Sequence, residues 1–403
     1  MVQLKYEEEG FTTKSYDEMI VHIPPGDGEG VQNPFQLNVA NILWPNNIYD
    51  GPWWSLNVQY EEPKIESVAP ALGPAQGFEV VLSGQNFGPS TNPSLPIVRV
   101  GNNGEYNCTI SQRDHKSVTC YISKGVGKDL DLSILVNGQE HTLGRSISYE
   151  PPKVTEVLPA RVHTNGGDVV TVNGLNFGVV QSDMILRTTT NNHPDVQNIV
   201  VPIANIKLWT DVSIQFVMPA GLGTSFGVQI IAGGQNSNID QTVGYMQPSI
   251  SNITLAGGRK ECTAMIRNED CGAPTSGGFL VEIIGSDFST KQLMDNANPT
   301  LFEIILDTVP VEKMGWCGDG QKIGCVEEHN HNVLRLYMPA GTGTQNDISI
   351  RIGNQLNTND ATAGTNLFSY DAPWINTITP REGNAGSIGN ADGNVIKLQG
   401  YVC

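Results

Sequence analysis

The sequence predicts an all-β protein, built as a row of β-sandwiches that follow one another along an elongated rod. Three observations lead to this prediction. Many short stretches alternate apolar and polar residues with period 2, and no stretch of about 12 or more residues has a clear period of 3.6. The 403 residues include 44 Gly and 24 Pro, which is typical of short strands joined by many turns. A short signature also recurs at domain-sized intervals.

The signature, Pro-x-Ile/Val-x-x-Ile/Val-x-Pro, opens each repeat and suits an edge strand because proline cannot donate to a sheet ladder. Its four copies begin at Pro63, Pro152, Pro248 and Pro373, so successive starts lie 89, 96 and 125 residues apart. Each interval is long enough for a core of its own. The predicted domains are 1–62 (the C-terminal part of a domain), 63–151, 152–247, 248–372 (with long insertions) and 373–403 (the N-terminal part of a domain).

Two further motifs recur in order inside the repeats. The first is Gly-x-Asn/Asp-Phe, in which we expect the glycine to allow a bend and the Phe to enter the core. The second is Gly-x-Gly, followed later by a closing Tyr. Because no helix and no Lys-Ser/Thr follows Gly-x-Gly, we interpret it as a turn and not as a phosphate loop. The copies are 84–87, 174–177 and 285–288 for the first motif; 26–28, 125–127, 221–223 and 341–343 for the second; and Tyr60, Tyr149, Tyr245 and Tyr370 for the closing residue.

These three motifs, in this order, resemble the IPT/TIG domains, the immunoglobulin-like domains of plexins and some transcription factors. The resemblance covers nearly the whole chain and implies an E-set, immunoglobulin-like sandwich of about seven strands per repeat. The repeat from Pro248 departs from the pattern, since Leu255 replaces the second proline and insertions follow around 256–275 and 289–331. Insertions of this kind can form a binding face.

The cysteines fall into local pairs, without the C-x-x-C spacing of zinc or thioredoxin-type sites. We predict the disulfides Cys108–Cys120, Cys262–Cys271 and Cys317–Cys325, and leave Cys403 unpaired or intermolecular. Disulfides indicate an extracellular or cell-surface protein. The sequons at Asn107 and Asn252 agree and predict N-glycans there. Sequons also arise by chance in a chain rich in Asn, Ser and Thr.

Composition excludes several functions. The net charge is −18, which disfavours nucleic acid. No apolar run is long enough to span a membrane. We find no nucleophile elbow and no pocket-forming pair of carboxylates, so we expect no enzyme, no catalytic residue and no cofactor.

A metal site is the alternative that the histidines raise. His329 and His331 would share one face of an extended strand, and Glu327 or Glu328 could complete a ligand set. We favour a solvated insertion loop at this position and therefore predict no metal. The other histidines are scattered over several repeats.

The partial repeats at the two ends together have about the length of one repeat. Half a sandwich exposes strand edges and an apolar face. Two remedies stay open: the C-terminal part of one copy completes the N-terminal part of the next, or the chain is a segment of a longer polypeptide. The first remedy predicts an interface of apolar and aromatic residues: Met19, Val21, Trp53, Trp54, Trp374, Ile375, Val395, Ile396 and Leu398.

Three functional hypotheses follow, of which the last, an ancillary part of a secreted enzyme, rests on the family resemblance alone because the sequence offers no catalytic domain. The first is a structural subunit or segment of a surface filament that assembles head to tail with itself. The second is the ectodomain of an adhesion or receptor protein that binds another extracellular protein or a glycan. The aromatic residues of the partial repeats fit either an interface or an ordinary core.

Overall fold

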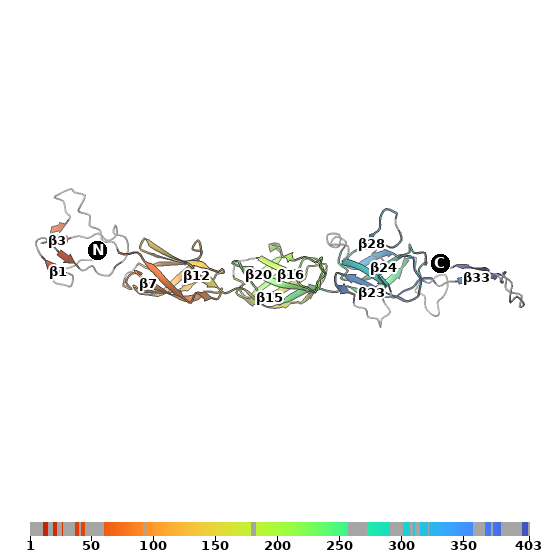
Figure 1. Ribbon diagram of the computed structural model, residues 1–403, viewed down its shortest axis with the longest axis horizontal. Coiled ribbons are helices and arrows are strands. Elements are labelled where there is room, and N and C mark those ends of the chain that lie inside the picture. The colour runs from red at the N-terminus through yellow and green to blue at the C-terminus, as the bar shows by residue number, and fades with distance from the viewer. Residues whose placement is uncertain are drawn as a thin grey trace, which may run out of the picture.

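The computed structural model places three β-sandwiches end to end (Figure 1). The described residues form strands, turns, loops and a few residues of 3-10 helix, so the predicted all-β class is confirmed. The structure describes residues 11–14, 19–21, 26, 37–39, 42–44, 60–91, 94–178, 183–256, 272–290, 301–306, 309–310, 315–320, 322–357, 367–371, 374–379 and 397–401.

The first sandwich is one continuous sheet that folds over itself, in the order β5-β7-β10-β9-β8-β11-β12-β6. All neighbours pair antiparallel except β6 and β12, which pair parallel. Its strands are β5 (Lys64–Ala69), β6 (Leu72–Gly73), β7 (Phe78–Gln85), β8 (Ile97–Val100), β9 (Tyr106–Arg113), β10 (Ser117–Ile122), β11 (Leu130–Val136) and β12 (Gln139–Tyr149). Strand β7 alternates buried and exposed residues along its whole length, as its period-2 sequence predicts.

The second sandwich has two separate sheets, β13-β15-β19-β18 and β14-β22-β20-β16-β17, with β21 paired to β20. Its elements are β13 (Lys153–Leu158), β14 (Arg161–Val162), β15 (Val169–Leu175), β16 (Asp183–Thr188), β17 (Ile199–Val200), the 3-10 turn Ile203–Asn205, β18 (Ile206–Trp209), β19 (Ser213–Val217), β20 (Phe226–Ala232), β21 (Gln235–Asn236) and β22 (Thr242–Tyr245).

The third sandwich also has two sheets, β23-β24-β29-β28-β27 and β26-β25-β30-β31, with β32 paired to β30. Its strands are β23 (Ser249–Leu255), β24 (Leu280–Ser286), β25 (Phe302–Leu306), β26 (Val309–Pro310), β27 (Gly315–Trp316), β28 (Cys325–His329), β29 (Val333–Tyr337), β30 (Asn346–Ile352), β31 (Gln355–Leu356) and β32 (Leu367–Phe368). The opening strands β5, β13 and β23 all lie at a sheet edge, which confirms the prediction from their prolines.

Short strand pairs lie outside the three sandwiches. Near the N-terminus β1 (Phe11–Lys14) pairs with β2 (Met19–Val21), and β3 (Leu37–Val39) pairs with β4 (Ile42–Trp44). Beyond the third sandwich, β33 (Trp374–Thr379) pairs with β34 (Lys397–Tyr401) in an extended hairpin (Figure 1).

The opening strand pairs with its neighbour in the same irregular register in every repeat. A bulge follows the residue that lies opposite a glycine, which belongs to Gly-x-Asn/Asp-Phe in the three sandwiches and is Gly400 in the last copy. The four opposed pairs are Ile65 with Gly84, Val154 with Gly174, Ile250 with Gly285 and Ile375 with Gly400.

The glycine of Gly-x-Asn/Asp-Phe is required because there is no room for a side chain at this position. A Cβ on Gly174 would lie 2.1 Å from the Lys153 carbonyl oxygen and 2.4 Å from the Phe177 ring. Phe177 is fully buried, as predicted. The bend itself falls two residues after the glycine, since Asn86, Asn176 and Asp287 adopt φ of 63°, 59° and 60°. Asn and Asp tolerate this left-handed conformation better than most residues, so the motif uses Asx for the bend and Gly for the close approach.

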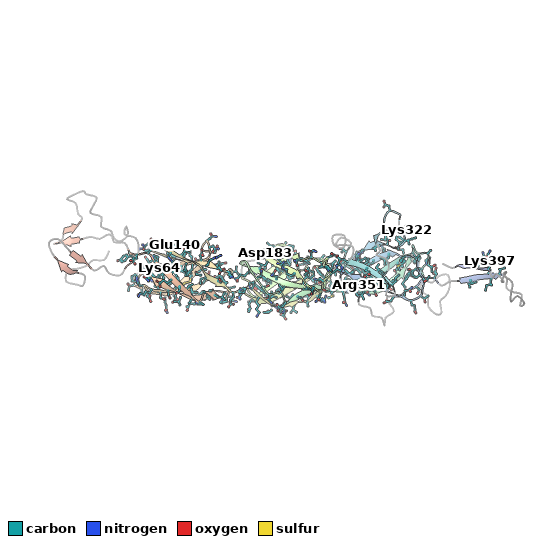
Figure 2. The ribbon with its side chains drawn as sticks, viewed as in Figure 1. Lys64, Glu140, Asp183, Lys322, Arg351 and Lys397 are labelled. Carbon is teal, nitrogen blue, oxygen red and sulfur yellow. A yellow bond between two sulfur atoms is a disulfide. The ribbon has the colours of Figure 1, made fainter. Side chains whose placement is uncertain are left out.

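The closing tyrosines bring the Gly-x-Gly loops onto the cores. Tyr245 is fully buried and its hydroxyl donates to the Pro219 carbonyl over 2.7 Å. A Cβ on Gly221 would lie 2.4 Å from that hydroxyl. The same contact joins Gly125 to Tyr149, Gly341 to Tyr370 and Gly26 to Tyr60. The labelled charged side chains lie outside these cores, along the whole row (Figure 2).

Candidate functional site at the interdomain junctions

A glutamine side chain reaches into the preceding domain at each junction. At the first junction, between the first and second sandwiches, Gln235 Nε2 donates to the carbonyl oxygens of Tyr149 (2.9 Å) and Gly127 (3.1 Å). At the second junction, between the second and third sandwiches, Gln355 Nε2 donates to Tyr245 O over 2.9 Å. Gln139 makes the equivalent bond to Tyr60 O over 3.1 Å. The tight turn before each glutamine places its amide against the closing Tyr of the previous repeat.

The Asx residue of Gly-x-Asn/Asp-Phe is a second junction element. At the first junction Asn176 Oδ1 accepts from the Ala75 N–H over 3.1 Å, and Asn176 Nδ2 donates to Glu150 over 3.0 Å. At the second junction Asp287 Oδ1 accepts from the Thr164 N–H over 2.9 Å. The left-handed backbone of this residue turns its side chain toward the preceding domain.

The middle residue of Gly-x-Gly supplies the apolar contact. Val126 lies so close to Gly178 that a Cβ there would be 2.4 Å from the Val126 side chain. At the second junction Leu222 is only 7% exposed and packs with the core of the third sandwich. Together with the polar bonds, this contact restricts rotation between adjacent sandwiches.

The two junctions are built on the same backbone plan, so their residues correspond position by position. The Phe87, Phe177 and Phe288 N–H groups donate to the carbonyls of His115, Asp211 and His331, which are therefore equivalent positions. Likewise the Gly77, Gly166 and Gly277 N–H groups donate to Pro74, His163 and Pro274. The second junction thus carries His163, Asp287 and His331 where the first carries Pro74, Asn176 and Asp211.

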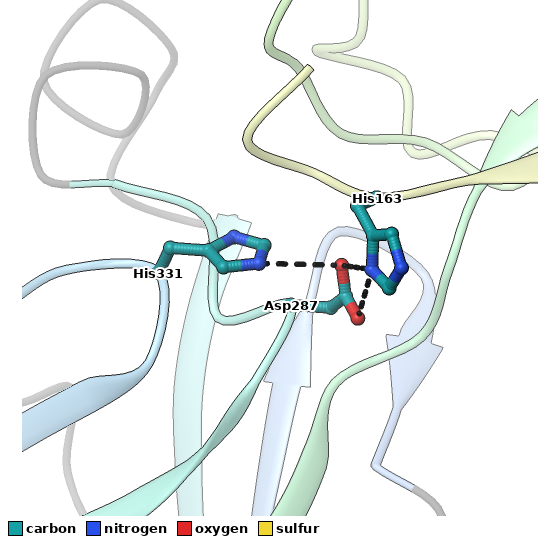
Figure 3. Close-up of side chains that lie close together, drawn as sticks. All are labelled: His163, Asp287 and His331. Carbon is teal, nitrogen blue, oxygen red and sulfur yellow. Dashed lines mark hydrogen bonds and ion pairs between the residues drawn. The ribbon is translucent and has the colours of Figure 1, made fainter. Parts of the chain in front are cut away.

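These three residues form a compact polar cluster between the second and third sandwiches. Figure 3 shows the Asp287 carboxylate between the two imidazole rings. His163 Nδ1 lies 3.2 Å from both Asp287 oxygens, and His331 Nε2 lies 3.7 Å from Oδ1. The potential ligand atoms all lie within 4.8 Å of one another. Imidazole nitrogens with a carboxylate are a common donor set for transition metals.

Burial differs sharply across the cluster. The exposed fractions of the side chains are 3% for Asp287, 14% for His331 and 49% for His163. Burial lowers the pKa of His331, and the nearby His163 lowers it further, whereas the Asp287 carboxylate raises it. Of the three side chains, His163 is therefore by far the most open to solvent.

Thr164 contacts the cluster through its hydroxyl group. Its Oγ1 lies 2.8 Å from His331 Nδ1, and the Ser289 N–H donates to the same oxygen over 3.3 Å. When His331 Nδ1–H donates to this oxygen, the Nε2 lone pair faces Asp287.

The expectation of a solvated loop at His329-Asn-His331 is wrong. His329 ends strand β28 and is 6% exposed, with its Nε2 2.6 Å from the Phe288 carbonyl oxygen. A turn follows, so the two histidines do not share one face of a strand. Neither nearby glutamate joins them, because Glu328 pairs with Arg335 and Glu327 accepts from the Tyr337 hydroxyl. The partners of His331 come instead from other segments of the chain.

Two of the three predicted disulfides are present in the structure: Cys108–Cys120 and Cys317–Cys325, with Cα–Cα distances of 5.5 and 5.0 Å. Cys262, Cys271 and Cys403 lie outside the described residues. Asn107 and Asn252, the two sequon asparagines, are both exposed on strands β9 and β23.

The predicted assembly residues lie mostly beyond what the structure describes. Trp53, Trp54, Val395 and Ile396 fall outside the described residues. Met19, Val21, Trp374 and Leu398 lie on strands, but their side chains are not described. Ile375 is 54% exposed. The polymerisation hypothesis stays a prediction.

Comparison with known proteins identifies two of the repeats. The family model described as "IPT/TIG domain" matches residues 63–149 and 152–245. Fibrocystin-L of Mus musculus is 32% identical over 119 residues, which is 28% of this chain. The chain spans about 3% of the length of fibrocystin-L.

Solved structures similar to the chain include the extracellular region of plexin A4, at 15% identity and a TM-score of 0.24, covering 82% of this chain and 27% of that one. The surface glycan-binding protein PbSGBP-B of Prevotella bryantii has 12% identity and a TM-score of 0.30, covering 62% of this chain and 67% of that one. At these values the likeness says nothing about a ligand. In the part of the chain that the structure describes, no helix is long and apolar enough to cross a membrane.

Proposed function

We propose that this chain, which contains two tandem IPT/TIG domains, has a non-enzymatic binding role. It would act in the ectodomain of a cell-surface adhesion or receptor protein. The observation that carries the proposal is the repeated junction. Each of the two junctions combines a glutamine bond to a closing Tyr, an Asx bond to a loop N–H and a close apolar contact. Sandwiches coupled in this way hold their surfaces at fixed relative orientations.

Two disulfide bonds, which form in oxidising compartments, support the extracellular location. The Cys108–Cys120 bond joins neighbouring strands in the core of the first sandwich, and the Cys317–Cys325 bond fixes a loop of the third. Asn252 lies on an exposed strand position, where an N-glycan can be attached without disturbing a core. Asn107 is also exposed, but it lines a depression on strands β8 and β9.

The proposed partner is another extracellular protein. Exposed apolar side chains on the first sandwich include Leu95, which is 66% exposed, and Ile97, which is 46% exposed. They line a shallow depression on strands β8 and β9, beside Asn107. Apolar side chains beside a solvated rim are typical of protein interfaces.

Binding to cells tests this proposal and separates the two classes of partner. The chain, secreted from mammalian cells and tetramerised, is added to cells treated with protease, with glycosidases or with neither. Loss of binding after protease alone supports a protein partner. Loss after glycosidases indicates a glycan, and absence of binding to a broad set of untreated cells would contradict an adhesive role.

Leu95→Asp combined with Ile97→Asp is the matched surface variant. Both residues are exposed, so the fold should be retained while the apolar surface is lost. The control, Val200→Asp, changes a residue of the second sandwich that is also 66% exposed. The proposal predicts reduced cell binding for the first variant and unchanged binding for the control.

A further inference from the structure

The cluster at the second junction has the composition and spacing of a metal site. We propose that His163, Asp287 and His331 bind a divalent transition-metal ion of the zinc class, which bridges the second and third sandwiches. His163 comes from the second sandwich, whereas Asp287 and His331 come from the third (Figure 3).

The distances fit a tetrahedral zinc ion. Zinc binds imidazole nitrogen and carboxylate oxygen at about 2.0–2.2 Å, so neighbouring ligand atoms in a tetrahedron lie about 3.4 Å apart. The separations of the Asp287 oxygens from His163 Nδ1 and His331 Nε2 are 3.2 and 3.7 Å. The ligand atoms all lie within 4.8 Å of one another, so the side chains must draw closer together to surround one ion.

The outer contacts favour the ligating forms of the side chains. Metal-binding histidines commonly donate the other ring N–H to a nearby oxygen, which fixes the ring. Thr164 Oγ1, 2.8 Å from His331 Nδ1, is placed for this role. The Thr164 N–H donates to Asp287 Oδ1 over 2.9 Å and orients the carboxylate.

The first junction shows that the fold does not require these three residue types. There, Pro74, Asn176 and Asp211 occupy the equivalent positions, and the bond from a loop N–H to the Asx side chain is retained. An asparagine is therefore sufficient for the junction bond. The two imidazoles and the buried carboxylate of the second junction are therefore not needed for the backbone arrangement that both junctions share. They add a set of groups that can bind an ion.

The donor set also indicates which ion fits. Calcium and magnesium prefer oxygen ligands, whereas two imidazoles favour zinc and its neighbours in the transition series. Three protein ligands leave one coordination position for water, on the open side at His163. An ion held from both sandwiches would stiffen the second junction, and the first junction has no corresponding set of ligands among its equivalent residues.

Calorimetric titration of the full chain with ZnCl₂, with disulfides intact and at pH 7.5, tests the proposal. The expected result is one equivalent of zinc that Asp287→Asn and His331→Ala each weaken at least tenfold. Asp287→Asn keeps the bond to Thr164, as Asn176 does for Ala75, so it should fold. His115→Ala, which removes an exposed imidazole of the first sandwich, should leave the affinity unchanged.

A second measurement uses unfolding of the same proteins. Zinc should raise the unfolding temperature of the third sandwich in the unaltered chain and leave it unchanged in Asp287→Asn. No zinc binding, zinc binding that neither Asp287→Asn nor His331→Ala weakens, or calcium binding without zinc binding would each overturn the proposal.

Discussion

The Gln355 side chain donates a hydrogen bond of 2.9 Å from its Nε2 to the backbone oxygen of Tyr245. Tyr245 lies 110 residues earlier and closes the preceding sandwich. Gln235 makes the same bond to Tyr149. The residue that ends one core is thus the acceptor for the next domain. The partner of the Tyr245 carbonyl is a buried glutamine of the next domain. The fold therefore fixes the orientation of adjacent sandwiches.

A carboxylate in place of the Gln235 amide should weaken the first junction. Gln235→Glu removes both donors to Tyr149 and Gly127 and places negative charge against two carbonyl oxygens. We expect a loss of about 1–3 kcal/mol from the coupling between the first two sandwiches. Hydrogen exchange measured by mass spectrometry should show faster exchange around Gly127 and Tyr149. Gln112→Glu, at an exposed position on β9, is the control and should have no such effect.

A methyl group in the Gly-x-Gly loop should disrupt the first core. The Cβ of Gly125→Ala would lie 2.6 Å from the Tyr149 hydroxyl and 2.6 Å from the Tyr106 ring. We expect a destabilisation of the first sandwich of about 2–3 kcal/mol. Gly144→Ala is the matched control, because its Cβ meets nothing closer than 3.5 Å. Denaturant unfolding that shows equal stability for the two variants would refute the tight packing between loop and tyrosine.

The buried tyrosines predict a loss of stability at high pH. Burial raises the pKa of Tyr370 from 10.0 to about 12, and it raises those of Tyr149 and Tyr245 further, with Tyr106 adding to the effect at Tyr149. Because these pKa values are higher in the folded protein, the stabilisation is complete below about pH 10 and is lost as the pH rises through 12. Unfolding temperatures recorded from pH 8 to 11.5 should fall above pH 10.

Tyr245→Phe provides the control for this effect. It removes one titrating hydroxyl, so the decrease between pH 10 and 11.5 should be smaller for the second sandwich, although stability at pH 8 falls by about 1 kcal/mol with the lost bond to Pro219. An equal decrease in both proteins would argue against the tyrosines as the cause.

Reduction should affect the sandwiches unequally. The Cys108–Cys120 bond closes a short loop, and its loss should cost the first sandwich about 2–3 kcal/mol. The second sandwich contains no cysteine and serves as an internal control. Hydrogen exchange with and without reductant should show faster exchange in the first sandwich and no change in the second, while the third also responds because it holds Cys317–Cys325. Unchanged exchange in the first sandwich would mean that the bond does not stabilise it.

The sequence was sufficient for the fold because the relevant signals are local. Period 2 and the prolines predicted the edge strand β5, and the Phe of Gly-x-Asn-Phe was correctly placed in the core. The bend was assigned to Gly84, whereas the left-handed residue is Asn86. The pattern shows that a turn is present, but the lack of space opposite Gly84 depends on the paired strand.

The junctions could not be predicted from the sequence in the same way. Gln235 and Tyr149 lie 86 residues apart, and their contact depends on how two complete domains meet. His331 was assigned to a loop with His329 because the two are close in sequence. Its partner His163 lies 168 positions earlier, so no local pattern connects them. The signal that was available is the recurrence of Asx and Gln at equivalent positions in successive repeats.

The fixed orientation of neighbouring sandwiches is the central claim, and the distance between them tests it most directly. Pulsed electron spin resonance on the full chain, with labels at exposed Lys116 and Lys207, measures the distribution of distances across the first junction. A single narrow distribution that broadens in Gln235→Glu is the predicted result. A broad distribution in the unaltered protein, with no change in the variant, would contradict it.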